Sequence, residues 1–361
     1  MQLQNNPLIR VTLLQLIYRA PVVFLPYTYI VLRYMAFPRS TATFGCFWSC
    51  SHYFLNRGSP CSRALVTSLH SLFKTTSGGT HSLRLMSSHS NGAESSSSHL
   101  ERTEHSPRQE FLVQGTVTEI TQLSKTVKGL SIEVKDRRFS FKCGQWVDFF
   151  IPGVPTVGGF TICSSHRLLK EKRSIDLAVK HSEHPPALWV HTQCQVGSKV
   201  HMKVGGECYF DPNPEGSSPD LLLIAGGVGI NPLYSIAQHV ADISSDASHQ
   251  YDGKTVLLFS AKNQDELLYK DNLLKMSEKC PSILCKFFVT KPDADTQTNV
   301  NSVQCERGRI NESRLQEAVS SLDRNRLICY ICGPPPMIQQ ITEILYKMDI
   351  EENRILFEKW W

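Results

Sequence analysis

The sequence predicts two folded domains: an antiparallel β-barrel, then a doubly wound α/β domain with a five-stranded parallel sheet. Two observations support this fold class. Between residues 114 and 210, short segments rich in β-branched and aromatic residues follow one another without long helical patterns. After Asp220, continuous apolar runs alternate with segments whose apolar residues recur at helical spacing. With 361 residues, 41% of them hydrophobic, the chain is long enough to bury two cores.

Six segments of the first domain have the composition of strands. Several alternate apolar and polar side chains, which is typical of a sheet with one face in a core. The six segments are GTVTEITQL, LSIEVK, WVDFFIP, GGFTICSS, SIDLAVK and KVHMKVGGECYF. Many short strands of this kind favour a small antiparallel barrel or sandwich. The run DPNPEGSSPD, from Asp211 to Asp220, interrupts the pattern with Pro, Gly and Ser and is typical of a domain boundary.

The second domain alternates strands with helices. Its five expected strands are LLLIA, TVLLF, ILCKFFVT, LICYI and RILFE. The segments between them carry apolar residues on one helical face, and the first such face contains Leu233, Ile236, Ala237 and Val240. This alternation predicts a parallel sheet with helices on both faces. Ligands of such sheets bind at the carboxyl ends of the strands, so the loops after the strands are the candidate site.

Residues 1–93 differ in composition from the rest of the chain. They contain no Asp or Glu but eight Lys and Arg, together with many Ser and scattered aliphatic and aromatic residues. An acid-free N-terminus with spaced arginines is typical of a mitochondrial transit peptide. We therefore expect a targeting, low-complexity region over residues 1–93 and a mature protein in the mitochondrial matrix.

A membrane anchor is the alternative for this region, because Val11–Tyr18 and Val22–Leu32 are strongly apolar. A helix needs about 20 apolar residues to span a bilayer. Arg19, Pro21 and Pro26 interrupt the runs before that length is reached. The interruptions favour a targeting segment over a stable anchor.

Residues 94–109 are rich in Ser and His and poor in aliphatic residues, so we expect a linker there.

The net charge of the whole chain is positive only because of the basic N-terminus. Outside it, 30 Lys and Arg stand against all 33 Asp and Glu, a net charge of −3. A mildly acidic body gives no reason to expect a nucleic acid or an anionic membrane as partner.

The chain has 12 cysteines, but their spacing predicts no metal centre. Cys280 and Cys285 have the opening spacing of a plant-type iron–sulfur loop, yet Phe288 occupies the third ligand position. Cys329 and Cys332 have redox spacing, but Cys329 lies inside the apolar strand LICYI, where a buried reduced thiol is expected. Free thiols also suit a mitochondrial matrix.

The first candidate loop is AGGVGINP, after the strand LLLIA. A dinucleotide fingerprint G-x-G-x-x-G started at Gly227 meets Pro232 instead of its third glycine. The glycines allow a sharp turn and close approach of a ligand, and Pro232 suits a first helical turn, whose N-terminus attracts a pyrophosphate. A tight connector without a ligand is the alternative. The candidate cofactor-binding residues are Gly226, Gly227, Val228, Gly229, Ile230, Asn231 and Pro232.

The second candidate loop is CGPPPMIQQ, after the strand LICYI. Cys332 and Gly333 end the strand, the prolines from Pro334 stiffen the turn, and Met337 begins an apolar helical face. A rigid ledge with few side chains suits a flat ring such as nicotinamide. Taken alone, a proline run after a strand is more often a stiff helix start.

Together the two loops give a specific resemblance. An AGG-x-G-I-x-P loop, a later CGP-x-x-M loop, a small barrel before them and an aromatic C-terminus resemble the ferredoxin–NADP reductase superfamily, from about Glu110 to Trp361. The resemblance implies a flavin-reductase-type FAD-binding barrel over residues 110–215 and an NAD(P)-binding domain over residues 216–361.

The resemblance also implies roles for residues of the second domain. The first loop would hold the pyrophosphate of NAD(H), with NADP(H) as the alternative. Cys332 would lie near the nicotinamide as a catalytic residue, and Gly333, Pro334 and Met337 would shape the pocket. Glu358 stands where relatives carry a catalytic acid. Trp361, or its neighbour Trp360, would cover the flavin ring, with packing of the last strand as the alternative.

The flavin side departs from the family pattern. Relatives carry Arg-x-Tyr-Ser on a barrel strand, whereas this chain has Gly158 at the arginine position. The contacts implied for FAD or FMN are Phe160, Thr161, Ile162 and Cys163. The segment HPPALWVH lacks the Gly-x-x-Ser that would bind the flavin phosphates. A phosphate-paired arginine makes a strong charge-assisted contact, and only Arg167, Lys180 or His181 could replace it.

Two functions follow. The first is an oxidoreductase that passes a hydride from NAD(P)H to a flavin and then electrons to an unidentified acceptor such as a protein. The second is a non-catalytic NAD(H)-binding module that has lost its flavin. Lys262 and Lys291 follow the strands where the 2′-phosphate of NADPH would lie, but exposed lysines are usually solvated, so NADH is the favoured donor.

Overall fold

The computed structural model describes residues 98–213, 216–246, 251–291 and 305–358. They belong to the second of two compact units into which the chain divides, Gly92–Trp361. The expected targeting region, its two apolar runs, Trp360 and Trp361 lie outside the described residues. Among the residues that are described, no helix has the length and apolar character needed to cross a membrane.

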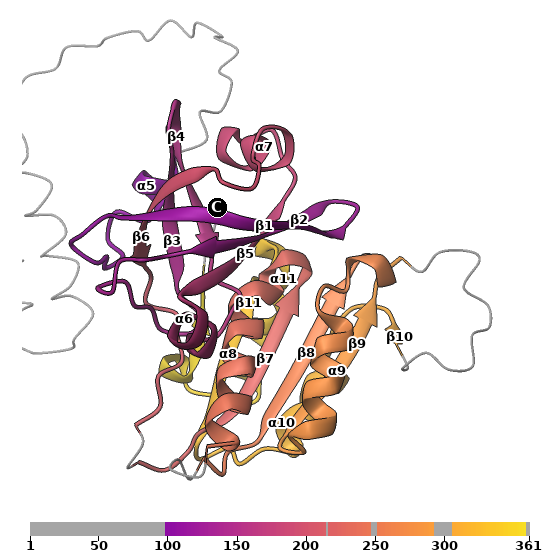
Figure 1. Ribbon diagram of the computed structural model, residues 1–361. Helices are drawn as coiled ribbons and strands as arrows, with labels where there is room; N and C mark the ends of the chain where they lie inside the picture. The colour runs from indigo at the N-terminus through magenta and orange to yellow at the C-terminus, as the bar shows by residue number, and fades with distance from the viewer. Residues whose placement is uncertain (1–97, 214–215, 247–250, 292–304, 359–361) are drawn as a thin grey trace, which may run out of the picture. The chain divides into compact units, whose positions relative to one another are not determined.

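The first domain is a six-stranded antiparallel sheet with the order β4-β3-β6-β1-β2-β5 (Figure 1). Its strands are β1 (Val113–Ser124), β2 (Val127–Glu133), β3 (Trp146–Ile151), β4 (Val154–Thr161), β5 (Ser174–Lys180) and β6 (Lys199–Gly205). An antiparallel bridge between Ile162 and Leu177 joins the two edge strands β4 and β5. The sheet therefore closes on itself as the predicted barrel. Two short helices, α6 (His166–Lys172) and α7 (Pro185–Thr192), flank β5 in the sequence.

The second domain is a parallel sheet with the order β10-β9-β8-β7-β11-β12. The strands are β7 (Asp220–Gly226), β8 (Thr255–Ala261), β9 (Ile283–Val289), β10 (Cys305–Arg307), β11 (Leu327–Cys332) and β12 (Ile355–Phe357). The helices are α8 (Ile230–Ser244), α9 (Lys270–Lys279), α10 (Glu312–Ser320) and α11 (Pro335–Lys347), with single 3₁₀ turns η2 (Gly227–Gly229), η3 (Gln264–Glu266) and η4 (Glu352–Arg354). The sheet runs outward from β7 to β10 and resumes at β11, so its switch point lies between β7 and β11.

The prediction of five strands is wrong by one. The additional strand, β10, pairs in parallel with β9 at the edge of the sheet. It contains only Cys305, Glu306 and Arg307, and all three side chains are at least partly exposed. A three-residue polar segment carries no apolar run and no alternation, so the sequence pattern could not reveal it.

The central strand β7 shows why the strands of the second domain could be predicted from the sequence. All seven of its residues are buried. Leu221, Leu223 and Ala225 pack into the cluster that also holds the barrel core, whereas Leu222 and Ile224 pack into a second cluster with α10 and α11. A strand covered on both faces must be apolar at every position, which gives the continuous run LLLIA.

The expected linker over residues 94–109 is wrong from Ser98 onward. Helix α5 (His99–Arg102) begins with a capping box between Ser98 and Glu101. The Nε2 atom of His99 lies 2.8 Å from one carboxylate oxygen of the buried Asp148 on β3, and Nε of Arg108 lies 2.8 Å from the other. The segment packs on the barrel through a buried ion network, which a search for apolar periodicity does not detect.

Candidate functional site

The structure brings the two candidate loops into direct contact at the switch point. Strand β7 ends at Gly226 and its neighbour β11 ends at Cys332, with Ala225 and Cys332 as register partners. A Cβ atom on Gly229 would lie 2.2 Å from the carbonyl oxygen of Cys332 and 2.7 Å from the backbone nitrogen of Gly333. Only a glycine lets the backbones of the two loops approach this closely.

Met337 packs against the carboxyl ends of both β7 and β11. A Cβ atom on Gly226 would lie 2.6 Å from Sδ of Met337 and 2.9 Å from Cδ of Pro334. A Cβ atom on Gly333 would lie 2.8 Å from Cε of the same methionine. The predicted residues of the second loop therefore line the strand ends through a thioether and a proline ring, a flat surface with few polar groups.

Gly227 has a different role from the neighbouring glycines. Its φ of +56° lies in the left-handed region, and a Cβ atom placed there would meet no atom within 4 Å. The backbone at this position thus faces open space next to the N-terminus of α8. A helix N-terminus next to exposed backbone is suited to bind a pyrophosphate through N–H groups and the helix dipole.

Three predicted residues of the first loop are buried rather than presented to a ligand. Ile230, Asn231 and Pro232 occupy the first turn of α8. The side chain of Asn231 donates a hydrogen bond, 2.9 Å long, to the carbonyl oxygen of Ala178 on β5. This contact ties the loop to the barrel, so the side chain of Asn231 holds the loop in position.

The polar face of α8 continues the connection to the barrel. The Ser235 hydroxyl donates to the carbonyl oxygen of Ser164 at 2.7 Å, and the Gln238 amide donates to that of Cys163 at 2.8 Å. Asp242 accepts a hydrogen bond of 2.6 Å from Ser165. The apolar face of α8 predicted its packing on the sheet. The polar residues that recur on its opposite face could have predicted that this face also packs, against the barrel.

The two candidate catalytic residues, Cys332 and Glu358, lie close together and near Cys208, a residue that no sequence pattern singled out. Cys332 ends β11 and is buried, and Glu358 directly follows β12, whose Phe357 is the register partner of Ile331. Burial raises the pKa of the half-buried Cys208 well above its usual range, and the nearby Glu358 and Cys332 add to the shift. No spacing pattern connects Cys208 with the second domain, because it follows the last barrel strand.

The flavin-side residues divide into two groups. Ile162 and Cys163 are buried in the core, and the Cys163 thiol donates to the carbonyl oxygen of Asp176 at 3.1 Å. Burial raises the pKa of this thiol to about 12. Phe160, by contrast, is only partly buried and meets Phe149 edge-on at 5.3 Å between ring centroids. Of the predicted strand contacts, Phe160 is thus the side chain available to a ring system.

An aromatic stack that the sequence analysis missed lies close to Cys163. The rings of Tyr234 on α8 and Tyr269 before α9 are parallel, with centroids 4.1 Å apart. Burial raises the pKa of the Tyr269 hydroxyl well above its usual range, and the neighbouring Cys163 thiol adds to the shift. The two tyrosines are far apart in the sequence, and no periodicity connects them.

The residues around Gly158 do not fit the phosphate end of a flavin bound as in the family pattern. A Cβ atom on Gly158 would lie 2.8 Å from Cβ of Pro186 and 3.0 Å from the Phe160 ring. Helix α7 also begins with Pro185 and Pro186, which have no N–H groups to donate. An arginine at position 158 has no room, and the helix start is poor in donors.

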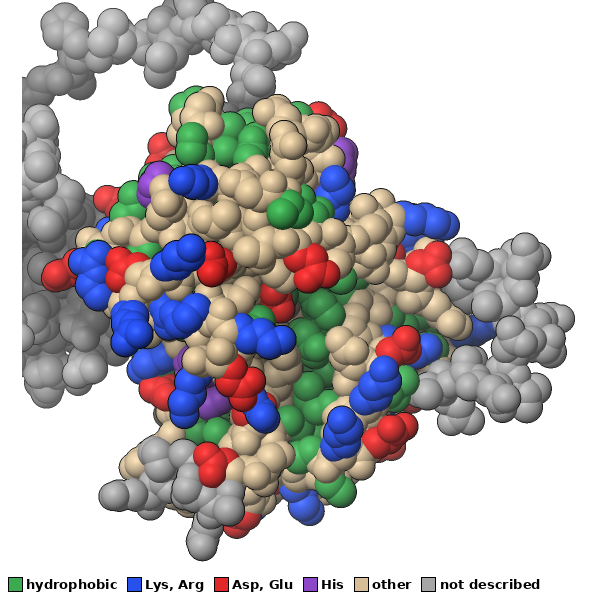
Figure 2. Space-filling view, in the orientation of Figure 1, with side chains coloured by type: hydrophobic (Ala, Val, Ile, Leu, Met, Phe, Trp, Pro, Cys, Tyr) green, Lys and Arg blue, Asp and Glu red, His purple; other side chains and the backbone are tan. Residues whose placement is uncertain are grey.

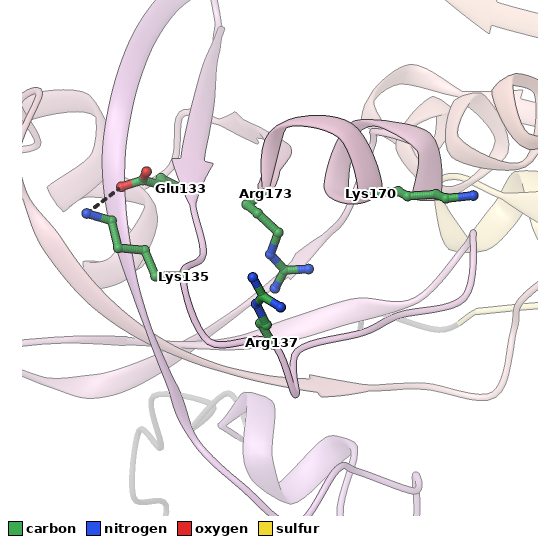
Figure 3. Close-up of a pocket in the computed structure, with 5 residues that line it drawn as sticks. All are labelled: Glu133, Lys135, Arg137, Lys170 and Arg173. Atoms are coloured by element: carbon green, nitrogen blue, oxygen red, sulfur yellow. Dashed lines mark ion pairs between the residues drawn. The ribbon is translucent and has the colours of Figure 1, made fainter.

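A basic hollow on the barrel contains none of the predicted residues. It is lined by Glu133, Lys135, Arg137, Lys170 and Arg173, and its lysines and arginines are drawn in Figure 3. The Arg173 guanidinium is held by the carbonyl oxygens of Val134 and Asp136. Lys and Arg side chains gather over the barrel around α6 on the face shown in Figure 2. The hollow is suited to anions, but its position on α6 and the end of β2 separates it from the strand ends described above.

The fold and the joined loops define a class of protein, the two-domain reductases similar to ferredoxin–NADP reductase. The cytochrome P450 reductase GcoB from Amycolatopsis has the same fold with a TM-score of 0.57 and 18% identity, over 71% of each chain. A ferredoxin NADP+ reductase from Neisseria gonorrhoeae, solved with bound FAD and NADP, gives a TM-score of 0.54 and 16% identity, over 70% of this chain and 100% of that one.

Sequence comparison identifies a particular family within this class. The family model described as the oxidoreductase NAD-binding domain matches residues 223–343. The Danio rerio protein named oxidoreductase NAD-binding domain-containing protein 1 is 51% identical over 266 residues, which cover 73% of this chain and 97% of that protein. The chain therefore belongs to the oxidoreductase NAD-binding domain-containing protein 1 family.

Proposed function

We propose that the protein is an NAD(P)H-dependent flavin oxidoreductase that uses NADH as its main donor. The observation that carries this proposal is the contact of Gly229 with the backbone of Cys332 and Gly333, which joins the loops of β7 and β11 into one dinucleotide site. FAD is the proposed flavin, with FMN as the alternative. When bound, a flavin would accept the hydride and release electrons singly or in pairs.

The residues of the chain have separate roles in this proposal. The backbone from Gly226 to Gly229 and the start of α8 hold the pyrophosphate. Met337 and Pro334 orient the nicotinamide ring by packing against one face. Cys332 and Glu358 lie next to this ledge and act on the position and protonation of the reacting groups. The electron acceptor is proposed to be a separate protein.

The test is the absorbance spectrum of the purified full chain, before and after incubation with FAD or FMN. The expected result is a flavin spectrum that anaerobic NADH bleaches. A colourless protein that binds NADH but cannot be loaded with either flavin would contradict the proposal.

One observation favours a second function, a non-catalytic NAD(H)-binding module. Pro186 fills the place in which the family's arginine would approach the flavin phosphate, so the barrel has lost its strongest flavin contact. Under this alternative, NADH binding changes the stability or the partner of the protein without any electron transfer. The same spectrum separates the two functions, because only the enzyme takes up a reducible flavin.

We also propose that the protein works in the mitochondrial matrix, a proposal supported by the acid-free composition of residues 1–93. Incubation with isolated mitochondria is expected to give a shortened, protease-protected product. A chain that keeps its full length and resists carbonate extraction would instead support a membrane anchor.

A further inference from the structure

Three side chains with metal-ligand chemistry meet where the barrel contacts α8. The ligand atoms of Cys143, His166 and His239 all lie within 4.8 Å of one another. Cys143 precedes β3, His166 is the first residue of α6, and His239 lies on α8. The three residues are far apart in the sequence, so a search for closely spaced ligands could not have found them.

The surrounding structure orients two of these side chains. Cys143 is fully buried, and its carbonyl oxygen accepts a hydrogen bond of 2.9 Å from the backbone N–H of Phe210. The Nε2 atom of His166 is bonded to the carbonyl oxygen of Phe141. Because a carbonyl can only accept, Nε2 carries the proton and the lone pair of the neutral ring is on Nδ1. Histidines that ligate metals usually donate their other N–H in this way.

We propose that Cys143, His166 and His239 form a zinc site. Zinc favours sulfur and nitrogen ligands, and sites with three protein ligands and an open fourth position are common. Tetrahedral zinc at the usual bond lengths separates such ligand atoms by about 3.4 to 3.6 Å. Since the ligand atoms lie within 4.8 Å of one another, they must approach one another by at most about 1.4 Å, a change that side-chain rotation supplies. The fourth position is left to water.

A carboxylate and the domain arrangement support the site. Asp242 follows His239 by one turn of α8, and it accepts a hydrogen bond from Ser165, the residue before His166. Asp242 also pairs with the Arg167 guanidinium at 3.6 Å, so it contributes to the site as a hydrogen-bonded carboxylate beside the ligands. A bound ion would link the loop before β3, α6 and α8, and so fix the barrel against the second domain at a distance from the dinucleotide loops.

Simple packing is the alternative. The His166 and His239 rings meet edge to face, with centroids 5.0 Å apart, and a buried cysteine behaves as a small apolar side chain. Burial raises the pKa of the Cys143 thiol to about 11, so a metal ion must displace a proton there, as coordinating metals do. Packing alone predicts a cluster that takes up no metal.

The experiment uses the full chain, stripped with a chelator and then titrated with Co²⁺ or Zn²⁺. One ion per chain is expected to bind at this site, with a near-ultraviolet thiolate-to-cobalt charge-transfer band and a higher unfolding midpoint in Zn²⁺. Cys143→Ser should abolish the band, and His239→Gln should weaken binding at least tenfold, since each removes a ligand. Residues 1–97 also contain Cys and His, so every variant is compared with the wild type.

The matched controls are Cys194→Ser and His201→Gln, which change a partly buried cysteine and histidine outside the cluster. Both should keep the band and the affinity. The proposal is overturned if the wild type binds no metal, or if folded Cys143→Ser keeps the charge-transfer band. If Cys143→Ser does not fold, His239→Gln with unchanged metal content is the overturning result.

Discussion

Replacing Gly229 with alanine tests the contact on which the proposed dinucleotide site depends. The added Cβ atom would lie 2.2 Å from the carbonyl oxygen and 2.5 Å from the carbonyl carbon of Cys332. These are backbone atoms, which cannot rotate away, so the two loops must separate by roughly 1 Å to restore normal contact. Overpacking of this kind costs about 1–3 kcal/mol. If the bound state bears this cost, the Kd for NADH rises by about 5- to 160-fold.

The assay is NADH binding by titration calorimetry, with circular dichroism to confirm that each variant is folded. Gly197→Ala is the matched control, because Gly197 also gains a Cβ atom and has a φ of +92°, but no atom lies within 4 Å of that position. Its backbone strain should reduce stability without changing NADH affinity. A folded Gly229→Ala protein that binds NADH within twofold of the wild type would refute the assignment of the two loops.

Three further predictions concern the barrel and the donor site. Asp148→Asn should cost about 3–5 kcal/mol, measured by urea unfolding. Burial opposes ionisation of Asp148, yet hydrogen bonds from His99 and Arg108 lower its pKa. The stability difference should therefore be full above about pH 4 and shrink as the pH falls through the folded-state pKa of Asp148. Replacing both Lys262 and Lys291 with alanine should weaken NADPH binding about tenfold and leave NADH binding unchanged. The reason is that a backbone hydrogen bond of 2.7 Å holds these two exposed residues side by side next to the strand ends. Equal losses of affinity for both nucleotides would contradict this prediction. Gly158→Arg should lower the unfolding midpoint by overpacking against Pro186 and give no gain in flavin affinity over the wild type, as thermal melts and flavin titrations followed by absorbance would show.

The parts of the fold that were predictable from the sequence are those in which burial alone determines the residues. Strand β7 is apolar throughout because each face belongs to a different core cluster. The apolar face of α8 was found in the same way. The edge strand β10 and the packed segment after Ser98 were not, since β10 is short and polar and His99 and Arg108 are held by the buried Asp148. Burial through charge pairing leaves no periodic signal.

The residues of the candidate site likewise divide into those that the sequence predicts and those that it does not. The glycines and prolines of the two loops were visible because backbone geometry restricts them to a few residue types. Cys208 was not visible, because only the contact of the barrel with the second domain brings it near Cys332 and Glu358. The stacked Tyr234 and Tyr269 were not visible either, because they meet only when α8 packs beside the segment before α9. The sequence thus identifies the two candidate loops, while the residues that surround them require the tertiary structure.

The missing arginine at position 158 shows how the structure changes the meaning of a sequence observation. From the sequence, Gly158 could mean either that the flavin is lost or that another cation replaces the arginine. In the structure, Pro186 packs against the Cα of Gly158 from the first turn of α7, so the glycine and the proline fit each other. A replacement cation would have to reach the phosphate from outside this packed pair. Under the proposed function, flavin affinity is therefore expected to depend on ring contacts at Phe160, and a Phe160→Ala protein that still loads FAD as the wild type does would contradict that expectation.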